Sequence, residues 1–453
     1  MIDKYNYFIH TSCMLDINLI RTQTSWVREQ LLKRGADIDF TTLLKMDTDK
    51  RKLQTANDEL KNKRNTVTAE IARIKKSGAN ADKLITEMKK IGDTIAKNDA
   101  TIADLEQRIY DFMSAVPNIP SADSIAGGKE NNRVLKTFGK MPTFNFTPKN
   151  HVDLCVGLGL IDYERAAKIS GKNTWVYTGA GAILEWALLN YFIDFHITNG
   201  YKFLMLPHLL NYQSGVVAGQ FPKFTDDVFI TNYHADIRQS KFLLPTAETA
   251  LINMHRDEIV DANVLPIKYA GFTPCYRKEA GNYRTEERGM IRGFQFNKVE
   301  MFVFCTPEDT PKYFAELTKY AEKLVEGLGL HYQTVALAAG DCSSAMAKTY
   351  DVEVFIPSMN VYKEVSSISA CNDYQARRGN IRYRSQATPG AGDKNKPQFL
   401  HTLNASGLAT SRLIPAIVEQ FQQSDGSVAI PKVLHKYMHG MTVLRPDKDK
   451  QAQ

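Results

Sequence analysis

The sequence of 453 residues is poor in cysteine, and its six cysteines are widely scattered. They form no CxxC pair and no cluster with histidine at the spacing of zinc ligands. We therefore expect free thiols in a reducing compartment and no zinc site. The cysteines are Cys13, Cys155, Cys275, Cys305, Cys342 and Cys371.

Long hydrophobic runs are missing as well. No apolar stretch approaches the ~18 residues that a membrane-spanning helix needs. The opening residues 1–7 lack the basic start and the apolar stretch of a signal peptide. These absences predict a cytoplasmic protein without a membrane segment.

The familiar nucleotide-binding loops are also lacking. The chain has no GxxxxGK[ST] phosphate-binding loop. The glycine pair in Gly179-Ala180-Gly181 lacks the third glycine and the strand-to-helix setting of a dinucleotide fingerprint, so we expect a tight turn there.

Charge of one sign is not in large excess. The formal net charge of +7 is too small to prove a nucleic-acid partner, but it is compatible with one. A hydrophobic content of 43% supports a well-buried core in at least one of two or three domains. The length excludes a single small module.

What the sequence does contain, before residue 115, is helical periodicity. Two apolar series run at alternating spacings of three and four, interrupted only by Arg64 in the first and Asn98 in the second. Between them, the string from Ser77 to Asp82 is turn-prone and ends in a candidate N-cap. The pattern predicts an antiparallel coiled-coil hairpin over about 42–114, with helices that reach roughly 45 Å. The series are Leu53, Ala56, Leu60, Val67, Ile71 and Ile74, then Leu84, Met88, Ile91, Ile95, Ile102, Leu105, Ile109 and Phe112.

The first of these helices is locally basic. Nine lysines and arginines between residues 50 and 76 face only three acidic residues. Such a run is typical of a solvated coiled-coil face. It also suits an arm that binds a polyphosphate backbone. The arm alone leaves both interpretations open.

A domain boundary is expected near residues 115–135. The prolines in Val116–Pro120 cannot continue a helix, and the Gly/Asn-rich residues that follow have the composition of a linker. We therefore expect an N-terminal domain at 1–118, a linker at 119–149 and a second domain at 150–453.

The second domain has a mixed pattern. Helical segments such as 183–199 alternate with β-branched or aromatic runs such as 294–304 and 352–356. No internal repeat is present. This favours one large α+β domain built on a mostly antiparallel sheet.

The most informative stretch is a pair of β-rich segments around a charged loop. They predict a hairpin with Arg277 and Glu279 on one face, because side chains two apart on a strand point the same way. Phe296, Lys298 and Glu300 alternate likewise. Cross-strand Arg–Glu pairs on a solvated sheet would be the plainer explanation of such a pattern.

These residues resemble motif 2 of class II aminoacyl-tRNA synthetases, in the form found in seryl-tRNA synthetases. Gly200 to Pro207 resembles motif 1, Thr246-Ala247-Glu248 the serine-binding TxE element, and Gly407 to Arg412 motif 3. The motif 2 residues are Arg277, Lys278, Glu279, Ala280, Gly281, Arg292 and Gln295 to Glu300. The likeness runs from Met14 to about Met438, and residues 1–13 match nothing. It implies a class II antiparallel sheet flanked by helices, with the N-terminal hairpin as an arm.

The resemblance implies that serine is activated with ATP and then transferred to tRNA. Arg277 is expected to hold the α-phosphate and Arg412 to reach the γ-phosphate, because arginine suits bidentate contacts with phosphate oxygens. Phe296 is expected to stack on adenine, with Glu279 near its amino edge. The implied ATP-binding residues are Arg277, Lys278, Glu279, Phe296, Glu364, Val365, Ser366, Ser367 and Arg412.

Two further groups follow from the same resemblance. Glu364 and Ser367 are expected to bind Mg²⁺, a hard ion suited to oxygen ligands. Thr246, Glu248 and Glu300 are expected to form an acceptor-rich pocket for the serine ammonium and hydroxyl groups, which would reject alanine without an editing domain. The implied serine-binding residues are Thr246, Ala247, Glu248, Glu300, Asn404 and Ser406, and the implied catalytic residues are Arg277, Glu300 and Arg412.

The implied partners are tRNA and a second copy of the chain. The basic arm is expected to bind tRNA(Ser) by shape, with tRNA(Sec) as a further candidate. Motif 1 implies a homodimer. One rival is a related enzyme that charges a carrier protein, although such relatives lack the long arm. The other is an inactive RNA-binding paralogue, against which the intact Arg277, Glu300, Glu364 and Arg412 argue.

Overall fold

The computed structural model describes residues 15–232, 234–279, 289–384 and 396–446. Residues 1–13, Met14 and the Ala280-Gly281 pair of motif 2 therefore lie outside the described residues. The chain divides into two compact units. Ala36–Pro117 and the residues up to Glu29 form the smaller unit, and Gln30–Gly35 and the residues from Asn118 onward form the larger one.

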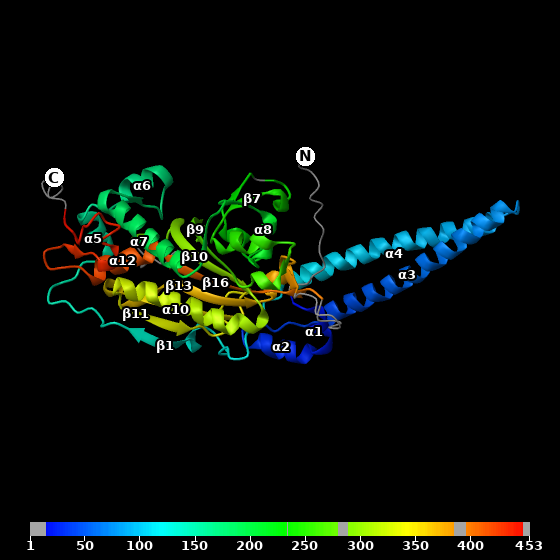
Figure 1. The fold of residues 1–453 in the computed structure, drawn as a ribbon, viewed down its shortest axis with the longest axis horizontal. Helices are drawn as coiled ribbons and strands as arrows, with labels where there is room; N and C mark the ends of the chain where they lie inside the picture. The colour runs from blue at the N-terminus through cyan, green and yellow to red at the C-terminus, as the bar shows by residue number, and fades with distance from the viewer. Residues whose placement is uncertain (1–14, 233, 280–288, 385–395, 447–453) are drawn as a thin grey trace. The chain divides into compact units, whose positions relative to one another are not determined.

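The smaller unit is dominated by a helical hairpin. Helices α3 (Thr41–Lys76) and α4 (Asp82–Ala115) pack side by side and run antiparallel (Figure 1). This confirms the predicted coiled-coil arm, whose ends lie within one residue of those expected. The unit also contains α1 (Ile17–Thr22) and the first part of α2 (Thr24–Leu32).

One polar layer interrupts the apolar contact between α3 and α4. The buried amide of Asn57 donates to Asp99 Oδ1 (2.8 Å) and accepts from Asn98 Nδ2 (2.8 Å). Asn98 is the polar residue that interrupts the second apolar series. The interruption is therefore explained by a layer of hydrogen bonds between the two helices. Because these groups meet in only one alignment of the two helices, the layer fixes the register of the hairpin.

The start of α4 differs from the expectation. Asp82 is the first helical residue, and the N-cap is Ala81, whose side chain makes no capping hydrogen bond. Asn80 assists instead, because its Oδ1 accepts from the Asp82 backbone N–H at 2.7 Å. The Asp82 carboxylate in the first turn is still favourable, since it faces the positive end of the helix dipole.

The larger unit is built on an eight-stranded sheet that is antiparallel except for its last pair. This confirms the α+β class. In spatial order the strands are β1 (Arg133–Phe138), β11 (Tyr332–Ala336), β12 (Lys348–Ile356), β13 (Val361–Asn372), β16 (His401–Ala409), β10 (Gln295–Cys305), β9 (Ile267–Tyr276) and β4 (Lys202–Met205). Smaller sheets contain β2 (Ile161–Asp162) and β3 (Val176–Tyr177); β5 (Leu209–Asn211), β6 (Ile230–Thr231) and β7 (Lys241–Leu243); β8 (Ile259–Asp261), β14 (Arg382–Arg384) and β15 (Gln398–Phe399); and β17 (Val428–Ala429) and β18 (Val443–Leu444).

Helices cover the large sheet and pack into two apolar clusters. Residues of α5, α7, α10 and α12 join one cluster, and residues of α8, α9 and α11 join the other. The helices are α5 (His151–Gly157), α6 (Tyr163–Ser170), α7 (Gly179–Thr198), α8 (Tyr212–Val217), α9 (Glu248–Leu251), α10 (Thr310–Leu328), α11 (Tyr374–Arg378) and α12 (Thr410–Gln420). Among the described residues, no helix has the length and apolar character needed to cross a membrane.

Strand β10 separates these two clusters by alternation. Val299 and Met301 belong to the cluster with α7, α10 and α12, whereas Phe302 belongs to the other. Lys298 and Glu300 lie an even number of positions from Phe302, so their side chains point to the same face of the sheet as Phe302. This face is opposite the one covered by α7, α10 and α12. The predicted alternation of this strand therefore puts its charged residues on one side of the sheet.

Strand β1 was not expected, because it lies in the predicted linker at 119–149. It pairs with β11 at the edge of the large sheet, with a register shift between Val134 and Lys136. Its side chains are mostly exposed or half-buried, so it lacks the apolar alternation by which a strand is recognised. The segment is therefore partly structural and not only a connection.

The glycine pair at 179–181 also differs from the expected tight turn. Gly179 has a left-handed φ of 47° and begins α7, four residues before the expected start at 183. A Cβ on Gly181 would lie 2.2 Å from the carbonyl oxygen of Leu160, so only glycine fits this approach. The pair therefore starts a helix that packs closely on the preceding segment.

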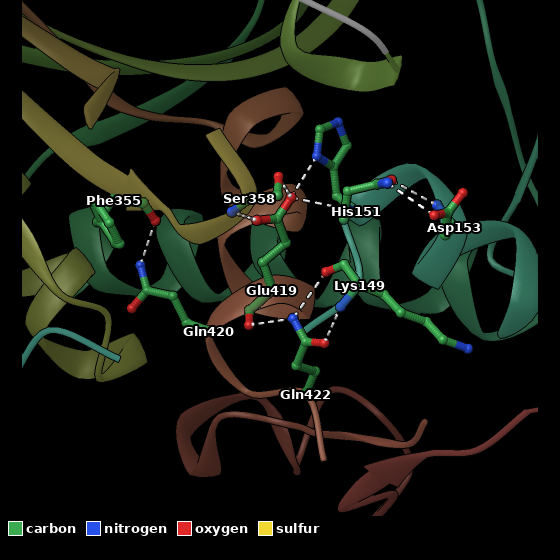
Figure 2. A network of polar contacts seen from close by, with 9 residues as sticks. Lys149, His151, Asp153, Phe355, Ser358, Glu419, Gln420 and Gln422 are labelled. Atoms are coloured by element: carbon green, nitrogen blue, oxygen red, sulfur yellow. Dashed lines mark hydrogen bonds and ion pairs between the residues drawn. The ribbon is translucent and has the colours of Figure 1, made fainter. Parts of the chain in front are cut away.

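A network of buried polar groups holds the carboxyl end of α12. The Glu419 carboxylate accepts from the backbone N–H groups of His151 (2.8 Å) and Ser358 (2.7 Å) and from Ser358 Oγ (2.8 Å), as Figure 2 shows. Its Oε1 also lies 2.7 Å from His151 Nδ1. Gln422 extends the network by pairing with the backbone of Lys149. These contacts join α12 to α5 and to the turn between β12 and β13.

We predict that Glu419→Leu destabilises the larger unit strongly. The substitution leaves the N–H groups of His151 and Ser358 buried without an acceptor, at a cost of about 3–5 kcal/mol. Glu419→Gln keeps one carbonyl acceptor and is expected to cost less. Thermal and urea unfolding of the full chain would measure both effects.

Glu164→Gln is the control for this experiment. Glu164 lies on α6 in an exposed ion pair with Lys168, so its substitution is expected to leave the unfolding midpoint unchanged. Equal midpoints for the Leu and Gln variants of Glu419 would contradict the prediction.

Candidate active site

The two β-rich segments of motif 2 form neighbouring strands, but their loop-side residues differ from the expectation. Strand β9 ends at Tyr276, and Glu279 has a left-handed φ of 52°. Strand alternation therefore does not apply to Arg277 and Glu279, and the prediction of a shared strand face is wrong. The Arg277 N–H still donates to Phe294 O at 3.0 Å, so the backbone departs from strand geometry after Arg277.

Arg277 and Glu279 each contact the facing segment in a different way. The Arg277 guanidinium lies over the ring of Phe296, 5.1 Å from its centroid, and Nε donates to Pro245 O at 3.2 Å. Glu279 pairs with Arg292 at 2.5 Å. Arg277 is thus fixed next to the segment that carries Thr246.

A buried charged cluster occupies the start of β10. Lys298 Nζ donates to Thr246 Oγ1 at 2.6 Å and forms an ion pair with Glu300. Asn404 Nδ2 donates to the other oxygen of Glu300 at 3.1 Å. Together with Glu248, these side chains come from three separated segments of the sequence, and all are nearly inaccessible.

Glu248 is the second buried carboxylate of this cluster. Its Oε1 accepts from Gln375 Nε2 at 2.7 Å. Burial and the nearby negative charge of Glu300 raise the pKa of Glu248 to about 7, although Gln375 and the Lys298 cation oppose the rise. The cluster thus contains two carboxylates and one lysine, an arrangement that favours a bound cation.

The register of β10 with β16 brings motif 3 to the same place. Glu300 is the cross-strand partner of Ser406, and Lys298 that of Ala409, directly before α12. In the first turn of α12, Arg412 donates from Nη1 to Glu364 O (2.7 Å) and from Nε to Ile291 O (3.3 Å). The two motifs therefore converge across one pair of strands.

Strands β12 and β13 carry oxygen-containing side chains that could serve as metal ligands, and one of them, Glu364, pairs with Arg412. The Glu364 carboxylate is half-exposed and lies 3.8 Å from Arg412 Nη1. Ser367 is the cross-strand partner of Asp351, a buried carboxyl group whose Oδ1 has no hydrogen-bond partner among the described residues. Burial and the charge of Glu364 raise the pKa of Asp351 well above its usual range. Two carboxylates and a hydroxyl are donors that suit a hard divalent cation.

Some expected ATP-binding and serine-binding residues turn their side chains elsewhere. Val365 and Ala247 are buried in the two apolar clusters. The Ser366 hydroxyl donates to Ser406 O at 2.6 Å inside the sheet. Lys278 is exposed, and its backbone N–H donates to Asp227 O. Val365, Ala247 and Ser366 therefore have only main-chain atoms to offer a ligand in this arrangement.

Sequence reasoning missed several residues of the site. Strand alternation puts Lys298 on the face of Glu300, but the family resemblance assigns it no role in the site. Asp351 is paired with Ser367 only through the register of two strands, and Gln375 reaches Glu248 from a separate short helix. No local pattern identifies contacts of this kind.

Family models match both parts of the chain. Residues 14–120 match the seryl-tRNA synthetase N-terminal domain, and residues 232–421 match the class II tRNA synthetase core domain of the G, H, P, S and T group.

Curated relatives match over nearly the whole chain. Serine–tRNA ligase 2 of Clostridium acetobutylicum is 52% identical over 426 residues, which cover 94% of this chain and 99% of that protein. The serine–tRNA ligase of Geobacillus kaustophilus is 42% identical, with 95% of this chain and 100% of the relative covered.

Solved structures agree at the level of the fold. The seryl-tRNA synthetase of Pyrococcus horikoshii, crystallised with ATP, superposes with a TM-score of 0.87 at 34% identity, covering 96% of this chain and 100% of that one. The cytoplasmic enzyme of Naegleria fowleri, in complex with AMP, gives 0.83 at 25% identity, with 96% and 99% covered. The chain therefore belongs to the seryl-tRNA synthetase family of class II aminoacyl-tRNA synthetases.

Proposed function

We propose that this serine–tRNA ligase forms seryl-adenylate between the start of β10 and the first turn of α12. A serine carboxylate oxygen attacks the α-phosphorus of ATP, a new P–O bond forms, and pyrophosphate leaves as the bond to the β-phosphate oxygen breaks. The convergence of Arg277, Glu300 and Arg412 across β9, β10 and β16 is the observation that supports this proposal.

The phosphate chain would lie between the two arginines. Arg277 would contact the α-phosphate and Arg412 the γ-phosphate, and their positive charges would stabilise the negative charge that builds up as pyrophosphate departs. Phe296 would stack on adenine, with Glu279 near the amino edge of the base and Lys278 at the exposed side of the site. Backbone contacts with Arg412 hold its guanidinium in place before ATP binds.

Mg²⁺ would be held by Glu364 and Ser367 together with phosphate oxygens. The oxygen donors near Arg412 fit such an ion, and the unpartnered oxygen of Asp351 supports a cation in their neighbourhood. When bound, the ion would neutralise part of the phosphate charge. Val365 and Ser366 would contribute at most main-chain contacts to ATP.

Serine would bind in the buried charged cluster. Its ammonium group would meet Glu248 and Glu300, and its hydroxyl would find acceptors at Thr246, Asn404 and Ser406. The side-chain oxygen Oδ1 of Asn404 has no hydrogen-bond partner among the described residues, so it can accept from a bound donor. Alanine would leave such groups unpaired, which supports strong discrimination without editing.

Transfer then joins the seryl group to tRNA(Ser). A terminal hydroxyl oxygen of the tRNA attacks the carbonyl carbon of the adenylate, AMP leaves, and the hydroxyl loses its proton. Positioning of the two substrates would suffice, without a protein nucleophile. We assign tRNA binding to the arm, where Arg64, Arg73, Lys75 and Lys76 are exposed and form no ion pair within the described part of the chain. tRNA(Sec) would present the same backbone phosphates to the arm. The enzyme would act in the cytoplasm, where its tRNA is found.

A homodimer would form through motif 1. Helix α7 and strand β4 expose large apolar side chains, including Trp186 at 55% and Met205 at 82%. Exposed apolar surface of this kind favours burial against a second copy.

The long arm favours a tRNA ligase over a carrier-protein aminoacylase. The assembled charged cluster favours an active enzyme over an inactive paralogue.

We predict that Arg277→Ala reduces serine-dependent exchange of pyrophosphate into ATP by at least roughly 100-fold, because a donor aimed at developing phosphate charge is lost. Arg277→Lys is expected to restore only part of the rate, since lysine cannot make bidentate contacts. Arg165→Ala, on the exposed side of α6, is the control. Near-normal exchange by Arg277→Ala would show that the motif 2 assignment is wrong.

A shortened arm separates the two half-reactions. Replacing residues 62–93 with a short turn keeps the Asn57 layer and removes the basic tip. Exchange should stay within about twofold of the wild type, while tRNA charging should fall by at least roughly 100-fold through lost phosphate contacts. Equal charging by the shortened enzyme would remove the tRNA role of the arm.

The dimer is tested by introducing charge into its proposed interface. Met205→Glu is expected to produce monomers in sedimentation velocity at micromolar concentration, because an unpaired carboxylate would be buried on association. Ile169→Glu, at an apolar position of α6 with 75% exposure, is the matched control and should stay dimeric. If both variants remain dimers, the interface lies elsewhere.

A further inference from the structure

Gln375 is a fully buried side chain with every polar group engaged. Its Nε2 donates to Glu248 Oε1 at 2.7 Å and to Ala218 O at 3.1 Å. Its Oε1 accepts from the hydroxyl of Thr402 at 2.8 Å. Gln375 and Thr402 are both 0% exposed. A side-chain amide in this setting cannot turn over without losing all three hydrogen bonds.

The direction of these hydrogen bonds has a chemical consequence. The Ala218 carbonyl oxygen can only accept, and the Thr402 hydroxyl donates to the amide oxygen, so the amide presents its NH₂ group to Ala218 O and Glu248. An N–H donor stabilises an ionised carboxylate over a protonated one. The relay therefore runs from Thr402 on β16, through Gln375 on α11, to Glu248 on α9.

We propose that Gln375, oriented by Thr402, is a positioning residue that holds Glu248 in place and ionised for the ammonium group of serine. The inference rests on the proposed function, in which Glu248 contacts serine. Gln375 itself is fully buried and acts only through Glu248.

The electrostatic setting explains why such a donor is needed. The groups that face Glu248 are Glu300 and Lys298 from β10, Arg277 after β9, and the Cys371 thiol from β13. Burial and Glu300 favour the protonated carboxyl, which places the pKa of Glu248 at about 7. Only the ionised form attracts an ammonium group, so the KM for serine should rise as the pH falls through this pKa. Loss of the Gln375 donor raises the pKa further and moves this rise to higher pH.

The test uses the full-length enzyme and pyrophosphate exchange between pH 6 and 8.5. Gln375→Met keeps the volume but removes the donor, and it should raise the KM for serine roughly 10- to 100-fold, as expected for a hydrogen bond to a charged group. The KM for ATP and the rate at saturating serine should change by less than about threefold. The pH at which the KM for serine begins to rise should also increase.

Thr402 provides a matched pair of variants. Thr402→Val removes the hydroxyl that orients the amide and should reproduce part of the Gln375→Met effect, whereas Thr402→Ser should behave like the wild type. If Gln375→Met does not fold, as judged by thermal unfolding, Gln375→Glu supplies the second test. Its carboxylate has the same shape without the N–H donor, and it should move the pH profile in the same direction.

The outcomes distinguish this inference from the proposed function. If Glu248→Gln raises the KM for serine and Gln375→Met leaves both the KM and its pH profile unchanged, the positioning role is wrong and the serine pocket stands. If Glu248→Gln leaves the KM for serine unchanged, the proposed pocket itself is wrong. A Gln375→Met enzyme whose KM for ATP and turnover deteriorate as much as its KM for serine would show a merely structural role.

Discussion

The buried ammonium group of Lys298 is the contact on which the rest of the site depends. It donates to Thr246 and pairs with Glu300 on the same strand, and it lies near a second buried carboxylate at Glu248. Without this cation, two carboxylates would share a space nearly free of water, and at least one of them would stay protonated. With it, the cluster lacks one positive charge, which the ammonium group of an amino acid can supply.

The sheet explains how distant parts of the chain reach this cluster. Strand β10 pairs with β9 on one side and with β16 on the other, so the strand ends that precede Arg277 and Arg412 flank the same end of β10. Alternation along β10 sends apolar residues toward the helices and charged residues toward the opposite face. The buried end of α12, held by Glu419, keeps the first turn of that helix and its arginine beside the strands.

Local periodicity was enough to predict the arm, the α+β class and the alternation of Phe296, Lys298 and Glu300. It failed where the backbone leaves a regular element. The strand containing residue 276 ends just before Arg277, so the rule that relates Arg277 to Glu279 no longer applies. It also failed for β1, an edge strand with mostly exposed side chains, and for Gln375, whose contacts depend on tertiary packing. The roles of single residues toward ATP and serine came from family resemblance and remain proposals.

The polar layer at Asn57 divides the hairpin into two parts that differ in how well they tolerate insertions and deletions. Between this layer and the start of α3, an inserted or deleted residue would rotate one helix by roughly 100° against its partner and would separate the matched amides. Beyond the layer, toward the turn, both helices can lose or gain paired turns while the alignment below is kept. Variation in the reach of the arm is therefore expected to accumulate at its tip, where basic side chains without an ion-pair partner in the described part of the chain also lie.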